Sequence, residues 1–166
     1  MTALATIRPV PRWADRAAHL VSLVVLPAGL WRIALAAGLS MGFSDADTAG
    51  LPGAQSIAIV ALSLVSEGVA LLTLGLVKPW GERFPRWIPR LAGRRIPPVP
   101  VVAAAATGAV ALQLIVAFAF RDPSVPGMDF STTGWKVLFY ACYAPLLLWA
   151  PLTAAVTVAY ARRRLG

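Results

Sequence analysis

The chain has 166 residues, of which 58% are hydrophobic and 13% charged, and its formal net charge at pH 7 is +8. Soluble domains carry about a quarter charged residues and just under half apolar ones, so this composition indicates an integral membrane protein. The basic excess does not indicate nucleic-acid binding, because the arginines and lysines fall in clusters between apolar runs and do not share one solvated face.

The sequence contains one cysteine, Cys142, and one histidine, His19. One cysteine excludes an intrachain disulfide and a cysteine-ligated metal cluster, and one histidine disfavours a histidine-based metal site. The P-loop, dinucleotide-binding, HExxH and GxSxG patterns are all lacking from the sequence. We therefore expect no metal and no cofactor, and we favour a protein that is not an enzyme.

The first apolar run extends over about 18–41 and follows an arginine-rich start. It is longer than the roughly 7–15 apolar residues of a signal peptide and contains Arg32, so we expect a retained membrane helix. About 20 residues, at 1.5 Å each, cross a hydrocarbon core of roughly 30 Å. Pro27 is expected to kink this helix, because it removes one backbone hydrogen bond.

Three further apolar runs are long enough to cross the membrane. Their helices are expected at about 54–77, 99–120 and 135–160, with a basic loop at 78–98. The predicted fold is a single all-α transmembrane domain over residues 1–166, with four helices in an up-down bundle. The basic clusters lie at the N-terminus, in the 78–98 loop and at the C-terminus, so the positive-inside rule places both termini in the cytoplasm.

The basic loop interleaves aromatic and basic residues, which is typical of a segment that lies along lipid headgroups. Each Lys or Arg near an anionic surface contributes about 1 kcal/mol. Headgroup contacts are expected from Lys78, Trp80, Arg83, Arg86, Trp87, Arg90, Arg94 and Arg95. Docking of a cytoplasmic partner on this loop stays open as an alternative.

Arg32 and Glu67 are the charges that lie deepest in the four-helix arrangement. Their expected axial offset of roughly 6 Å is within the reach of the two side chains. Each charge alone at the bilayer centre costs about 2.5–3.5 kcal/mol on insertion scales, so we predict that they pair. Both share a face with small residues suited to close helix contact. These are Ser22, Gly29 and Ala36 in the first helix, and Ser56, Ser63 and Ala70 in the second.

The pair has two possible roles. It fixes which helix faces meet, or it forms a site for a proton, an ion or a substrate. Gln113 and Tyr143 lie near the same depth and are candidates to complete a polar cluster. In the enzyme alternative, Glu67 is the general acid/base on a lipid or isoprenoid-like substrate, Arg32 orients it, and Tyr143 or Gln113 holds the substrate.

Three stretches carry a resemblance to a family: LWRIALAAG at 30–38, SEGVALLTLGL at 66–76 and PWGERFPRWIPRLAGRR at 79–95. Together they resemble uncharacterised four-helix integral membrane proteins of actinobacteria. The resemblance implies four helices and a plasma-membrane location, and it carries no activity over to this chain. We favour an accessory subunit or a small transport-type protein. The expected partners are the lipid bilayer with anionic headgroups and either a second copy or another membrane protein, without nucleic acid.

A structural Arg32–Glu67 pair predicts how variants accumulate in the membrane. Glu67→Gln alone leaves Arg32 without its partner, whereas Glu67→Gln combined with Arg32→Met removes both charges. We expect the single variant to accumulate less than the double variant on immunoblots of membrane fractions. Equal abundance of the wild type, the single variant and the double variant would contradict a structural pair.

Overall fold

The structure is a computed structural model that describes residues 9–43, 53–81, 93–119, 121 and 130–165. Its elements are α1 (Arg12–Ala36), α2 (Gly53–Gly75), the 3-10 helix η2 (Pro79–Gly81), α3 (Pro98–Ala119), α4 (Thr133–Tyr143), the 3-10 helix η3 (Ala144–Leu148) and α5 (Trp149–Arg164). Four segments are long and apolar enough to cross a membrane: α1, α2, α3 and the composite of α4, η3 and α5. Among the described residues, the prediction of an all-helical fold with four membrane-length helices is confirmed.

Helix α1 ends at Ala36, before the end expected near 41, because a glycine closes it. Gly38 has a φ of 88°, in the left-handed region that residues with a Cβ rarely adopt. The N–H of Gly38 donates to the carbonyl of Leu35 at 3.0 Å, and that of Leu39 donates to Ala34 at 3.2 Å. These two hydrogen bonds form a Schellman motif, which satisfies carbonyls at the helix end.

The same helix begins at Arg12, ahead of the start expected near 18, because Pro11 is its N-cap. Polar residues occupy the first turn of α1, so a helix start judged from the apolar run alone falls too late in the sequence. The N–H groups of Ala14 and Asp15 donate to the Pro11 carbonyl and close that turn. Pro27 lies inside α1, and the helix continues past it to its end.

Proline divides the fourth span. Pro145 has no N–H to donate to the carbonyl four residues earlier, and the chain passes through the 3-10 segment η3 at this point. Pro151 lies in the first turn of α5, where an N–H would have no intrahelical partner. Leu146 of η3 is buried in a cluster with residues of α1, so the break is packed.

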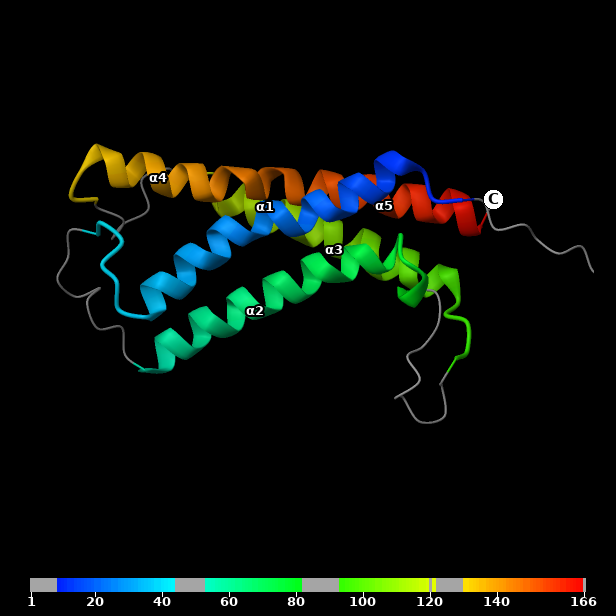
Figure 1. Cartoon of the computed structure of the whole chain (residues 1–166), viewed down its shortest axis with the longest axis horizontal. Coiled ribbons are helices and arrows are strands. Elements are labelled where there is room, and N and C mark those ends of the chain that lie inside the picture. Colours follow the sequence, from blue (N-terminus) through cyan, green and yellow to red (C-terminus); the bar gives the residue numbers. More distant parts are fainter. Residues whose placement is uncertain (1–8, 44–52, 82–92, 120, 122–129, 166) are drawn as a thin grey trace, which may run out of the picture.

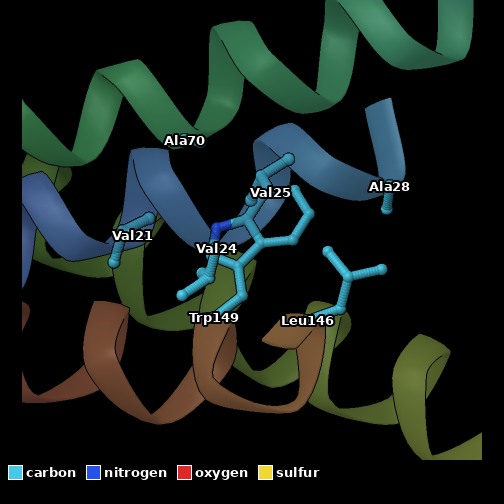
Figure 2. Close-up of a cluster of buried hydrophobic side chains, with 7 residues drawn as sticks. All are labelled: Val21, Val24, Val25, Ala28, Ala70, Leu146 and Trp149. Atoms are coloured by element: carbon cyan, nitrogen blue, oxygen red, sulfur yellow. The ribbon is translucent and has the colours of Figure 1, made fainter. Parts of the chain in front are cut away.

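Helix α1 lies between α2 and the fourth span (Figure 1). Helix α1 packs against α2 on one side and against α4, η3 and α5 on the other, while α3 packs against α5. Figure 2 shows the buried cluster where these elements meet. It consists of Val21, Val24, Val25 and Ala28 of α1, Ala70 of α2, Leu146 of η3 and Trp149 of α5. The outer faces of α2 and α3 are apolar and exposed, as expected of helices that face lipid.

An aromatic cluster joins the end of α1 to the start of α4. Phe43 and Phe130 stack with ring centroids 4.9 Å apart and also form an isolated β-bridge. The Trp31 ring meets Trp135 and Phe139 edge-on, at 6.2 and 5.6 Å between centroids. Edge-to-face pairs of this kind add about 0.5–1.5 kcal/mol beyond the area they bury. The cluster therefore stabilises the end of the molecule at which α1 finishes.

Gly42 is the position in this cluster that cannot accept a side chain. Its φ is 79°, and a Cβ there would overlap the Trp135 ring. The left-handed conformation alone costs about 1–2 kcal/mol for a residue with a Cβ. We expect Gly42→Ala to lower the midpoint of thermal unfolding in detergent. Gly68→Ala is the matched control, because nothing lies within 4 Å of a Cβ at this helical position. Equal midpoints for the two variants would contradict this account of the cluster.

Candidate functional site

The predicted polar residues of the first two spans meet at the contact between α1 and α2. The start of α1 lies beside the end of α2, so each turn forward along one helix is matched by a turn backward along the other. Arg32 is level with Ser63, and its Nε donates to the Ser63 Oγ at 3.1 Å. One turn away, Gly29 faces Glu67, and a Cβ at Gly29 would lie 3.0 Å from the Glu67 Oε1.

Ser63 is the residue that links the Arg32 guanidinium to the backbone of α2. Its side chain is buried, and its Oγ donates to the carbonyl of Ile59 at 2.9 Å while accepting from Arg32. Serine hydroxyls inside helices often donate to the carbonyl one turn earlier. The hydroxyl therefore links the Arg32 guanidinium to a backbone carbonyl of α2 through two hydrogen bonds. The second terminal nitrogen of Arg32, Nη2, is buried without a hydrogen-bond partner.

The structure differs from the predicted direct pair between Arg32 and Glu67. The ion pairs among the described residues are those of Asp15 with His19 and with Lys78, and an Arg32–Glu67 pair is not among them. Ser63 is level with Arg32 and accepts from its Nε, while Glu67 lies about one turn, or 5.4 Å, further along α2 and faces Gly29. The Oε1 of Glu67 is buried without a hydrogen-bond partner among the described residues.

Tyr143 lies close to this site, and Gln113 does not. Tyr143 is the last residue of α4, stacks on Phe139 with ring centroids 4.3 Å apart, and packs against the buried cluster that includes Val25 and Ala28 of α1. Gln113 is exposed on α3, where it lines a groove shared with α5. The structure therefore brings Arg32, Ser63 and Glu67 together at the α1–α2 contact, places Tyr143 against the neighbouring buried cluster, and leaves Gln113 on another face.

The role of Ser63 was not foreseen from the sequence, although a signal was present. Ser63 shares the small-residue strip of Glu67 and lies one turn closer to the level of Arg32. A serine on such a strip is normally counted as a packing residue, because small side chains allow helices to approach. Both Ser63 and Glu67 are within reach of the long arginine side chain, and helix periodicity does not specify which of them its conformation selects.

The predicted headgroup residues fall into three groups. Lys78 donates from its Nζ to the Asp15 carboxylate at 2.8 Å, so this amino group ties the end of α2 to the start of α1. Trp80 is 52% exposed, with its ring edge packed over Gly75. Arg94 and Arg95 are exposed after the basic loop. The remaining positions, Arg83, Arg86, Trp87 and Arg90, lie outside the described residues.

The arginines at the end of α5 also bind backbone carbonyls at this end of the molecule. Arg163 donates from Nη2 to the carbonyl of Leu76, just after α2, at 3.1 Å. Arg164 donates to Ile96, just before α3, at 3.5 Å. Both guanidinium groups also lie near the Tyr160 ring, at 5.6 and 6.0 Å from its centroid. The Leu76 carbonyl follows the end of α2, where carbonyls lack intrahelical donors, so Arg163 satisfies an acceptor that would otherwise need water.

Comparison of the chain with family models, with curated proteins and with solved structures gives no match. Among the described residues, no three His, Cys, Asp or Glu side chains gather where they could hold a metal ion. The α1–α2 site thus contains one guanidinium, one carboxylate, one serine hydroxyl and one nearby phenol. These groups suit hydrogen bonding between helices, and in principle proton transfer through Glu67.

The bond between Arg32 and Ser63 predicts a contrast between two serines of α2. Ser63→Ala removes the acceptor of the Arg32 Nε inside an apolar contact, which costs about 1–3 kcal/mol for the unpaired donor. Ser66→Ala is the matched control, because the Ser66 hydroxyl donates within α2 to Leu62 and no bond joins it to Arg32. We expect Ser63→Ala to lower the unfolding midpoint in detergent well below that of Ser66→Ala.

The contrast should disappear when the arginine is removed. In an Arg32→Met background no guanidinium is left to satisfy, so Ser63→Ala and Ser66→Ala should then have equal effects. Equal effects of the two serine variants in the wild-type background would contradict the role given to Ser63.

Proposed function

We propose that this protein is a multi-pass plasma-membrane protein of non-enzymatic type, serving as an accessory subunit or a small transport-type protein. The observation that carries the proposal is the hydrogen bond between Arg32 and Ser63. It places the intramembrane arginine in a contact between two neighbouring spans, where it fixes their register. A charge used in this way needs no substrate to explain its presence.

The lining of the groove between α3 and α5 also favours a protein of non-enzymatic type. The groove between α3 and α5 is lined by apolar residues together with Gln113 and Thr157, and none of its lining residues is titratable. Arg32, Glu67 and Tyr143 are not among the residues that line it. A catalytic acid must reach the atom it protonates, and this groove does not bring a substrate to Glu67.

The proposed topology is an up-down arrangement with both termini in the cytoplasm. The starts of α1 and α3 lie at the same end as the finishes of α2 and α5, joined there by the bonds of Lys78, Arg163 and Arg164. This end carries the basic clusters, and basic residues are retained on the cytoplasmic side. The exposed Trp80, Arg94 and Arg95 are suited to contact anionic headgroups there. The resemblance to actinobacterial four-helix proteins supports the plasma membrane as the location.

The alternative is a membrane-embedded enzyme acting on a lipid or isoprenoid-like substrate, with Glu67 as general acid/base. One observation favours it. The Glu67 Oε1 and the Arg32 Nη2 are both buried without hydrogen-bond partners, although both belong to a charged group. A substrate carrying one donor and one acceptor would satisfy both atoms. In this alternative Glu67→Gln leaves the abundance of the protein unchanged and alters the lipid composition of the membrane.

The proposed topology is tested by labelling cysteines from outside the cell. In a Cys142→Ala background, Ser131→Cys reports on the loop before α4 and Arg95→Cys on the basic loop before α3. We expect a membrane-impermeant maleimide to label Ser131→Cys on intact cells, and to label Arg95→Cys after permeabilisation. The opposite pattern would overturn the topology.

A further inference from the structure

A groove of about 400 Å³ runs along the outside of the molecule between α3 and α5. Small side chains line much of it, including Ala106 and Ala109 of α3 and Ala150, Ala154 and Ala161 of α5. Helix α3 is the least buried of the four spans, with 11% of its apolar window buried. Its main partner in the described chain is α5, and most of its surface faces outward.

Gln113 is the one side chain on α3 with a strong need for a hydrogen-bond partner. It is exposed, it lines the groove, and it has no hydrogen bond to any residue that the structure describes. It lies roughly 7 Å along the axis from the middle of α3, which is inside a hydrocarbon core of about 30 Å. A carboxamide that faces lipid loses its bonds to water, at a cost of several kcal/mol in a fully apolar medium. A partner at the same depth would remove this cost.

We propose that the groove between α3 and α5 is the interface of a homodimer, in which Gln113 pairs with Gln113 of the partner subunit. A carboxamide carries both donors and an acceptor, so it is complementary to itself, unlike an arginine or a glutamate. Two copies inserted in the same orientation are related by an axis along the membrane normal. A residue near that axis therefore meets its own counterpart at the same depth.

The surroundings of Gln113 suit a close contact of this kind. Ala106, Val110 and Ala117 are exposed and lie on the same helical face at spacings of three, four or seven residues. Small residues let two helix backbones approach in a membrane, where packing and hydrogen bonds drive association. Helix α3 contains no charged residue, so like-charge repulsion does not oppose the meeting of two copies. The dimer requires that both copies insert into the membrane in the same orientation. It does not depend on whether Glu67 is catalytic.

The experiment measures disulfide cross-linking of the full chain in native membranes and, after purification, in lipid vesicles. In the Cys142→Ala background, Ala117→Cys places a thiol one turn from Gln113 on the proposed interface. Leu64→Cys places one on the outer face of α2, where Leu64 is 64% exposed. We expect mild oxidation to link the chains of Ala117→Cys as dimers and to leave Leu64→Cys monomeric.

A second set of variants tests the carboxamide itself. Interhelical hydrogen bonds of this kind contribute about 1–2 kcal/mol in model peptides, so Gln113→Leu should weaken the dimer about fivefold or more. Gln113→Asn keeps a carboxamide and should retain part of the association. The unfolding midpoint of the separated monomers should be the same for Gln113→Leu and the wild type, because Gln113 makes no contact that folding of one chain requires.

Three outcomes would overturn the proposal. The first is a monomeric wild-type protein in purified vesicles, which would leave the groove to lipid chains or to a different protein. The second is equal cross-linking of Ala117→Cys and Leu64→Cys, which would indicate random collision. The third is an unchanged dimer in Gln113→Leu, which would show that the carboxamide does not hold the interface. None of these three outcomes changes the cysteine-labelling result that tests the topology. The dimer and the proposed topology can therefore be rejected separately.

Discussion

The guanidinium of Arg32 lies between two apolar helices and needs hydrogen-bond acceptors there. The packing of α1 against α2 depends on this requirement. An arginine at the bilayer centre costs about 2.5–3.5 kcal/mol on insertion scales when nothing compensates it. Ser63 compensates part of that cost by accepting from Arg32 and donating to a backbone carbonyl. In the register this bond requires, Ala70 packs beside the valines of α1 in the buried cluster. Hydrogen bonding and packing thus agree on one alignment of the two helices.

Helix α1 in turn organises the other spans, because it has buried residues facing in more than one direction. One side meets α2 through small residues and the polar site, and the other meets η3 and α5 through Val24, Ala28 and their neighbours. Helix α3 reaches this centre mainly through α5. The consequence is a gradient of burial, from 39% of the apolar window in α1 to 11% in α3. The least buried helix is therefore the one with surface left for another molecule.

Apolar runs and charge clusters predicted the four spans, because the membrane imposes a minimum length on any helix that crosses it. Helix ends were predicted less well, since they depend on single residues such as Pro11 and Gly38 that an apolar count does not weigh. Arg32 and Glu67 lie at the contact between α1 and α2 with the axial offset expected of them, yet the arginine donates to Ser63, which is level with it. The choice of acceptor depends on side-chain conformations, which helix periodicity does not specify. The contact between Trp31 and Trp135 joins residues far apart in the chain, and the local sequence around neither tryptophan predicts it.

The 3-10 segment η3 divides the fourth span into two helices, α4 and α5, with different contacts. Hydrogen bonds in 3-10 geometry are poorer than in an α-helix, so bending is easiest there. On one side of η3, α4 is attached to the end of α1 by aromatic rings. On the other side, α5 is attached to α3 and to the carbonyls near the basic loop. Helix α1 contacts α4, η3 and α5, so it supports the fourth span at the point where that span bends most easily.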